Sequence, residues 1–136
     1  MNPSIGTILI VDDEPHVIYV VKFKLEKAGY EVHTATNGKR AYDLALELRP
    51  DLIVTDFQMP GGSGLDLALR LNANEETSSI PLLMVTSRGH RVSPSELIKT
   101  NIKQVLAKPF SPRELISVIH EQLPGLHQGE SENRAA

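Results

Sequence analysis

Short apolar runs alternate along the chain with longer segments in which apolar residues recur every three or four positions. Four of the runs are continuous, which is typical of strands covered on both faces of a sheet. A fifth run, Glu31–Ala35, alternates between polar and apolar residues, as expected for an edge strand with one wetter side. We therefore predict five strands, and the four continuous ones should be buried or nearly so: Thr7–Val11, Leu52–Thr55, Leu82–Val85 and the shorter Val105–Ala107.

The segments between these runs carry helix signals. Apolar stripes at helical spacing predict three helices. The first carries Ile18, Val21, Leu25 and Ala28 and stops at Gly29; the second carries Ala41, Leu44, Ala45 and Leu48, between the N-cap Asn37 and Pro50; the third begins at Ser63-Gly64-Leu65-Asp66 and carries Leu65, Leu69 and Leu71.

Two further helices are indicated by capping boxes with proline at the first helical position. One box is Ser93-Pro94-Ser95-Glu96, and only Leu97 and Ile98 give that helix an apolar face. The other, Ser111-Pro112-Arg113-Glu114, opens a last helix that continues through Leu115, Ile119 and Leu123.

A strand followed by a helix thus occurs five times, which predicts an α/β fold: a doubly wound, five-stranded parallel sheet with helices on both faces. The flavodoxin-like strand order 2-1-3-4-5 places the alternating second strand at an edge. We predict one domain over residues 1–124. Residues 125–136, rich in Gly, Gln, Glu, Ser and Asn, are expected to form a disordered tail.

Composition narrows the class of protein. The 136 residues carry a formal net charge of -3, which gives no support to direct nucleic-acid binding. Cysteine is absent, so disulfides and thiolate catalysis are excluded. We find no secretory signal and no apolar run near the roughly 20 residues that span a membrane. The expectation is a soluble cytoplasmic domain without membrane contact.

Three acidic side chains follow predicted strands. Asp12 and Asp13 come directly after the first strand and Asp56 ends the third, so neighbouring strands should bring the carboxylates into one crevice. Crowded carboxylates repel one another and favour a bound cation, and oxygen ligands alone favour Mg²⁺ or another hard divalent ion. Capping of the first helix would explain one of the paired residues, but not both of them and not Asp56.

Two more residues reach the same edge of the predicted sheet. Thr86 ends the fourth strand with a hydroxyl, and Lys108 ends the fifth with an ammonium. A cation, an ammonium and a hydroxyl around one carboxylate form a pocket for a transferred phosphoryl group. In this hypothesis Asp56 is the nucleophile and becomes an acyl phosphate.

The set Asp12-Asp13, Asp56, Thr86 and Lys108-Pro109-Phe110 resembles the receiver domain of two-component response regulators, as does Asp56-Phe57-Gln58-Met59-Pro60 with Gly64 four residues after the proline. The likeness runs from about Thr7 to Leu123. It implies a phosphorylation switch that takes its phosphoryl group from a histidine kinase or phosphotransfer protein and signals to a downstream protein.

The resemblance also implies a role for each matching residue. Asp56 is the phosphoacceptor, and Asp13, Asp56 and the backbone carbonyl of Gln58 are direct metal ligands, with Asp12 acting through water. Lys108 pairs with the phosphoryl group and Thr86 hydrogen-bonds to it. The Lys108-Pro109 bond is often cis in the family, and the positions of Gln58 and Arg88 modulate how fast the phosphoryl group is lost.

One position departs from the family pattern. Receivers usually have Tyr or Phe three residues before the lysine, whereas this chain has Val105. Valine is short and stiff at χ1, so it cannot report activation by a large rotamer swing. We expect switching to rely on the loop Ser87–Ser93 and the fourth helix, with Arg91, Lys99, Lys103 and Gln104 as candidate contact residues.

Other functions fit the pattern of residues less well. A haloacid dehalogenase type phosphatase needs a second Asp two residues after the nucleophile, where this chain has Gln58. An adaptor that keeps the fold without using the phosphate gains some support from Val105. A nucleotide or flavin site is weaker, because the loop after the first strand has no glycine. The five histidines share no ligand spacing, and Gly61-Gly62-Ser63-Gly64 is better read as a turn with a helix N-cap than as a phosphate loop.

Overall fold

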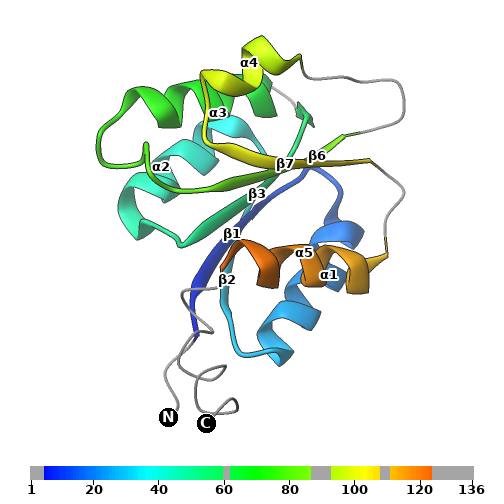
Figure 1. Ribbon diagram of the computed structural model, residues 1–136. Coiled ribbons are helices and arrows are strands. Elements are labelled where there is room, and N and C mark those ends of the chain that lie inside the picture. The colour runs from blue at the N-terminus through cyan, green and yellow to red at the C-terminus, as the bar shows by residue number, and fades with distance from the viewer. Residues whose placement is uncertain (1–4, 60–61, 87–92, 108–110, 124–136) are drawn as a thin grey trace, which may run out of the picture.

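The computed structural model describes residues 5–59, 62–86, 93–107 and 111–123. Five parallel strands form one sheet in the order β2-β1-β3-β6-β7, which confirms the predicted order 2-1-3-4-5 (Figure 1). The elements along the chain are β1 (Thr7–Val11), α1 (Pro15–Lys27), β2 (Glu31–Ala35), α2 (Gly38–Leu48), β3 (Leu52–Asp56), β4 (Gln58–Met59), β5 (Gly62–Ser63), α3 (Gly64–Ala73), β6 (Leu82–Thr86), α4 (Pro94–Ile98), β7 (Ile102–Ala107) and α5 (Pro112–Gln122).

Helices cover both faces of the sheet. In Figure 1, α1 and α5 lie on one face, and α2 and α3 lie on the other. Each face has its own apolar cluster, one built on Val21, Leu25 and Ile119 and the other on Leu44, Leu67 and Leu71. The alternation of strand and helix therefore produces the two-sided fold that the sequence predicts. None of the helices in the described ranges has both the length and the apolarity that crossing a bilayer requires.

The continuous apolar runs become the inner strands. β3 and β6 are buried at every residue, and β1 is buried from Ile8 to Val11. The prediction of burial is wrong for β7, where only Leu106 is buried. That strand lies at the edge of the sheet, and the short helix α4 beside it in sequence has no buried residue, so β7 is covered less completely.

The predicted caps are largely confirmed. Asn37 accepts a hydrogen bond from the backbone of Arg40, and Gly29 follows α1 with φ +108°. Ser93 forms a complete capping box with Glu96. At Ser111 the side chain accepts from the Glu114 backbone, but the reciprocal bond of a capping box is not formed in the described part of the chain. Ser63, in the segment predicted to be a turn with a helix N-cap, is the N-cap of α3 and forms a complete capping box with Asp66.

Two predicted apolar stripes are partly wrong. Ala28 is exposed because α1 ends at Lys27 and the chain turns away at Gly29. In α3 the buried residues are Leu67, Ala68 and Leu71, whereas Leu69 is 38% exposed and Leu65 is half-buried. Nearly every residue at the start of α3 is apolar or small, so several helical faces are equally plausible from the sequence.

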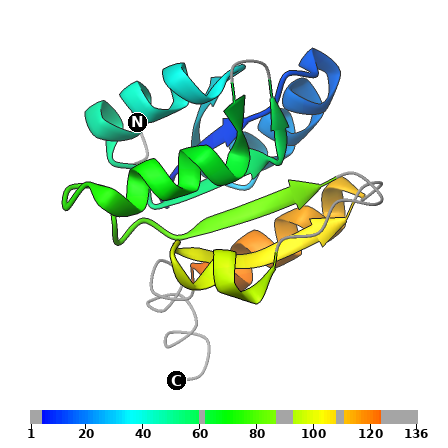
Figure 2. The same cartoon turned by 90° about the horizontal axis from the view of Figure 1, so that it is seen from above.

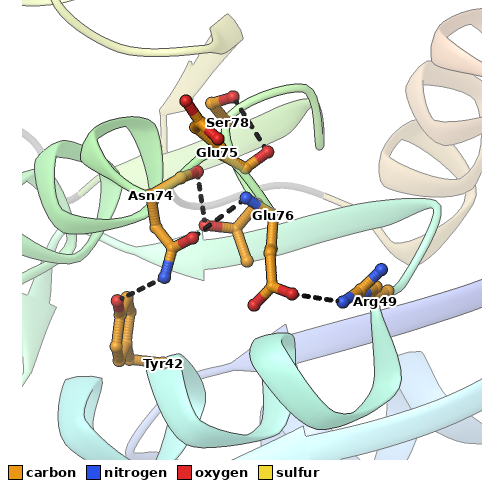
Figure 3. Close-up of polar contacts among 7 residues, drawn as sticks. Tyr42, Arg49, Asn74, Glu75, Glu76 and Ser78 are labelled. Atoms are coloured by element: carbon orange, nitrogen blue, oxygen red, sulfur yellow. Dashed lines mark hydrogen bonds and ion pairs between the residues drawn. The ribbon is translucent and has the colours of Figure 1, made fainter.

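A polar cluster joins α2 to the loop between α3 and β6 (Figure 3). The amide of Asn74 donates to the hydroxyl of Tyr42 at 3.1 Å, and Arg49 pairs with Glu76 at 2.6 Å. Arg49 is the C-cap of α2 and has φ 48°. These contacts hold the loop that leads into β6, whose other end bears Thr86.

Candidate functional site

The strand register places the predicted residues at one edge of the sheet. Val11 pairs with Thr55, so Asp12 and Asp56 each lie one residue beyond this pair on adjacent strands. Asp56 pairs with Val85, so Thr86 follows on the next strand. The carboxyl ends of parallel strands meet here, next to the point where the strand order reverses. Sequence and topology therefore agree on where chemistry can occur.

Asp12, Asp13 and Asp56 form a cluster, which we call the acidic site. One carboxylate oxygen from each residue lies within 4.8 Å of the others. Asp12 and Asp56 are each only 5% exposed, whereas Asp13 is exposed to solvent. Two buried carboxylates at this spacing repel each other strongly unless a cation or a proton offsets their charge. The donor set consists of hard oxygen atoms and fits a divalent cation such as Mg²⁺.

Asp12 also has a local structural role. Its Oδ1 accepts a hydrogen bond of 2.9 Å from the backbone N–H of Glu14, just before α1. The backbone N–H of Asp12 donates to Ala35 on β2 at 3.1 Å. The capping interpretation is wrong, because the N-cap of α1 is Glu14 and this helix has no side-chain cap; the Asp12 bond forms a local turn before the helix and does not account for the approach of Asp13 and Asp56. These contacts fix the position of Asp12 at the end of β1.

The end of β3 is fixed by backbone packing against α3. The N–H of Phe57 donates to Val85 at 2.8 Å, and the N–H of Gly64 donates to the carbonyl of Phe57 at 2.6 Å. A Cβ built on Gly64 would lie 2.2 Å from the carbonyl oxygen of Asp56. Only glycine permits this approach, so Gly64 helps to set the position of Asp56.

Gln58 lies in a structure that the sequence analysis missed. It begins the two-residue strand β4, which pairs antiparallel with β5 (Figure 2). In this pairing Gln58 lies opposite Ser63. The side chain of Gln58 is exposed, and its predicted role as a metal ligand concerns its backbone carbonyl. A strand of two residues is too short to show the alternation of polar and apolar residues that identifies a strand in a sequence. The glycines at 61 and 62 and the capping serine were the available signals.

Thr86 ends β6, as predicted, and is 4% exposed. It pairs with Ala107 on β7. Lys108 comes directly after Ala107 in the sequence but lies outside the described residues, as do Pro109, Phe110, Ser87 and Arg88. Val105 pairs with Met84 and is half-buried.

The histidines that the structure describes have surface or local roles, as predicted. His33 pairs with Glu31 on the edge strand at 2.7 Å. His120 shares a hydrogen bond of 2.7 Å with the hydroxyl of Tyr30, and His16 is exposed. Within the described residues, the acidic site is the one group found that could hold a metal ion through carboxylate, imidazole or thiolate side chains.

Comparison with known proteins supports the interpretation of the acidic site as the functional site. Residues 8–120 match the family model of the response regulator receiver domain. The chain is 39% identical over 126 residues to the phosphate regulon transcriptional regulatory protein PhoB of Pseudomonas aeruginosa, covering 93% of this chain and 55% of that protein. It thus spans about half the length of the curated relatives it matches.

Solved structures agree with the fold. A response regulator from Chloroflexus aurantiacus has a TM-score of 0.78 at 33% identity, covering 90% of this chain and 98% of that one. The receiver domain of the sensor histidine kinase PA1611 from Pseudomonas aeruginosa has a TM-score of 0.76 at 26% identity, covering 86% of this chain and 96% of that one. The PA1611 structure has a magnesium ion coordinated in its active site cleft.

The family match extends over the acidic site, Thr86 and all five strands of the parallel sheet. It excludes the dehalogenase-type phosphatase considered from the sequence, because receivers are signalling modules and not enzymes acting on other substrates. The chain belongs to the response regulator receiver domain family of two-component signal transduction, in which an aspartate accepts a phosphoryl group.

Proposed function

We propose that Asp56 is the residue of this receiver that accepts the phosphoryl group. The observation that carries the proposal is the convergence of Asp12, Asp13 and Asp56 within 4.8 Å at the carboxyl edge of the sheet. A carboxylate oxygen of Asp56 attacks the phosphorus of a phosphohistidine, the P–N bond breaks, and the imidazole leaves with a proton. The product is an acyl phosphate on Asp56.

Magnesium is the cation that best fits the acidic site. Asp13, Asp56 and the backbone carbonyl of Gln58 are proposed as direct ligands, with Asp12 acting through water. Oxygen donors and one solvent-exposed carboxylate suit an ion that keeps part of its water shell. When bound, the ion neutralises charge on the oxygens of the transferring phosphoryl group. The magnesium ion in the PA1611 receiver supports this choice.

Thr86 and Lys108 are proposed to contact the phosphorylated aspartate. Thr86 lies one residue beyond Val85, which pairs with Asp56 across the β3–β6 ladder. Its hydroxyl donates to a phosphoryl oxygen, and the ammonium of Lys108 pairs with another. The register of Ala107 opposite Thr86 supports a position for Lys108 near the same edge.

The phosphoryl group adds a charge of roughly −1.5 to −2, which is the local event that changes the signalling surface. We propose a sensor histidine kinase or phosphotransfer protein as donor, a downstream protein as target, and a cytoplasmic location. Because Val105 cannot make the aromatic swing of the family, switching is proposed to use residues 87–93 and α4. Lys99 and Lys103 are exposed in that region.

The test is phosphorylation by a small-molecule donor. Incubation with acetyl phosphate or phosphoramidate and Mg²⁺ is expected to add the mass of one phosphoryl group, and chelation of the metal should prevent this. Asp56→Asn should abolish the mass gain. Asp43→Asn is a matched control, because Asp43 is an exposed carboxylate on α2 outside the acidic site.

Two outcomes would reject the proposal. Phosphorylation that persists in Asp56→Asn would place the acceptor elsewhere. A wild-type protein that gains no mass with any donor, yet binds a partner, would support the adaptor reading instead. For the switching hypothesis, equal order of residues 87–93 in the presence and absence of beryllofluoride, measured by NMR relaxation, would count against it.

A further inference from the structure

A buried hydroxyl interrupts the apolar interior of the central strand β3. Thr55 is 0% exposed and follows residues 52–54, which are all apolar and buried. Its partners on the neighbouring strands, Val11 and Met84, are apolar and buried as well. Valine has the same branched shape and a similar preference for strands, so neither packing nor strand formation explains the hydroxyl. A hydroxyl buried in apolar surroundings costs free energy unless it is hydrogen-bonded, so its bonding partner indicates its role.

The Thr55 hydroxyl binds the backbone of the proposed phosphoacceptor. It donates a hydrogen bond of 3.0 Å to the backbone carbonyl oxygen of Asp56. The bond is buried, where a hydrogen bond is electrostatically stronger than in water. The same oxygen lies against Gly64 at the start of α3, since a Cβ added to Gly64 would be 2.2 Å from it. The Asp56 carbonyl is therefore fixed both by a donor and by close packing.

The other end of the same peptide group is fixed as well. The N–H of Phe57 donates to the carbonyl of Val85 on β6 at 2.8 Å. A peptide group is planar, so contacts to its carbonyl at one end and its N–H at the other determine its orientation. That orientation restricts the ψ angle of Asp56 and, with it, the direction in which the Asp56 side chain leaves the strand. The backbone thus aims the carboxylate.

This peptide group also links two of the proposed metal ligands. The carboxylate of Asp56 precedes it in the chain, and the backbone carbonyl of Gln58 follows Phe57. Rotation of the group would move these two oxygen donors relative to each other. A displacement of about 1 Å in a reacting group can slow a reaction by up to a hundredfold. A contact that prevents this rotation therefore matters for both metal binding and phosphoryl transfer.

We propose that Thr55 is a positioning residue for phosphoryl transfer. Its hydroxyl fixes the peptide group between Asp56 and Phe57, and thereby holds the Asp56 carboxylate and the Gln58 carbonyl in the geometry that binds the cation. Thr55 acts through the backbone and not by contact with the phosphoryl group. This inference rests on the proposed function, because it assigns a further residue to the same site.

Three variants of the full chain test the role of the hydroxyl. Thr55→Val removes the hydroxyl and keeps the branched shape, whereas Thr55→Ser keeps the hydroxyl. Thr77→Val is the matched control, because Thr77 is 1% exposed and its hydroxyl donates to the Leu71 carbonyl at 2.7 Å. The control therefore loses a buried threonine hydroxyl of the same kind, in the loop between α3 and β6.

The first measurement is the rate of mass gain with acetyl phosphate at saturating Mg²⁺. Thr55→Val should be labelled about tenfold more slowly than the wild type. Thr55→Ser should recover most of the rate, and Thr77→Val should keep the wild-type rate. Urea unfolding of the same proteins separates a loss of stability from a loss of rate.

Two further measurements do not depend on the reaction. In carbon-detected NMR of the unphosphorylated protein, Thr55→Val should shift the carbonyl resonance of Asp56 and leave that of Leu71 in place. Thr77→Val should do the reverse. In calorimetric titration, Mg²⁺ should bind Thr55→Val severalfold more weakly than the wild type, and Thr55→Ser should restore the affinity.

Several results would overturn the proposal. Wild-type labelling and wild-type Mg²⁺ affinity in Thr55→Val would do so, as would a serine variant as slow as the valine variant. Equal slowing in Thr77→Val would attribute the effect to stability alone. A wild-type protein that is not labelled by any donor would contradict the proposed function instead. In that case weaker Mg²⁺ binding by Thr55→Val would still support a positioning role for the hydroxyl, and unchanged binding would reject it.

Discussion

Gly64→Ala should displace the residue proposed as phosphoacceptor. A Cβ at this position would lie 2.2 Å from the carbonyl oxygen of Asp56 and 3.2 Å from Cα of Phe57. Ordinary contact begins near 3.4 Å, so the two backbones must separate by about 1 Å. The hydrogen bond from Gly64 to Phe57, now 2.6 Å, would lengthen as well. The end of β3 has little freedom to yield, because Asp56 is buried.

The size of the effect follows from this overlap. Overpacking against a backbone atom costs about 1–3 kcal/mol, which lowers the melting temperature of a domain this size by roughly 5–10 °C. A shift of about 1 Å in a reacting carboxylate can slow its reaction by up to a hundredfold. We therefore expect both lower stability and much slower phosphorylation of Asp56.

The assays are urea unfolding and the rate of mass gain with acetyl phosphate at saturating Mg²⁺. Gly29→Ala is the control, because its φ of +108° strains any L residue while its new Cβ would be 3.5 Å from Ile5, an ordinary contact. That strain costs about 1–3 kcal/mol, a loss similar to that of the test variant. It lies in the turn between α1 and β2, so labelling of Asp56 should keep its wild-type rate. A Gly64→Ala protein with unchanged stability and rate would refute the reasoning, and equally slow labelling in both variants would attribute the effect to stability alone.

Further predictions concern single side chains. Thr77→Val should lower the free energy of unfolding by about 1–2 kcal/mol in urea titrations, because Thr77 is 1% exposed and its hydroxyl donates to the Leu71 carbonyl at 2.7 Å; no change would contradict this. The backbone N–H and hydroxyl of Ser93 lower the pKa of Glu96 below 4.5, so this contact stabilises α4 above that pH and is lost as pH falls through the lowered pKa. In Ser93→Ala, carbon-detected NMR titration should find the pKa of Glu96 moved back toward 4.5. Without divalent cations, Asp56→Asn should stabilise the protein by roughly 1–3 kcal/mol through relief of repulsion in the acidic site. Added Mg²⁺ should stabilise the wild type more than the variant in thermal unfolding.

The fold was predictable where burial dominates the sequence pattern. Covered strands such as β3 and β6 show as continuous apolar runs, and caps such as Asn37 bracket the helices. The pattern of apolar residues gave a wrong prediction where several faces of a helix are equally apolar, because packing against the sheet then selects the buried face. In α3, Leu65, Leu67 and Leu69 offer more than one apolar face, and the sheet selects the face with Leu67.

The acidic site was predictable because topology turns sequence position into spatial position. A residue that directly follows a buried parallel strand must lie at the carboxyl edge of the sheet, and this rule placed Asp12, Asp56 and Thr86 correctly. The rule covers strand ends only. It could not find the β4–β5 hairpin that carries Gln58, or the close packing of Gly64, since both depend on backbone contacts over a few residues.

The acidic site is placed where folding alone would not place it. Asp12 and Asp56 are buried, and their carboxylates lie close to each other and to Asp13 at the carboxyl edge of the sheet. Burying carboxylates side by side lowers stability unless their charges are offset. A sequence shaped by folding alone would not hold these residues together. The arrangement is explained by binding of a cation, which makes the same edge of the sheet suitable for accepting a phosphoryl group.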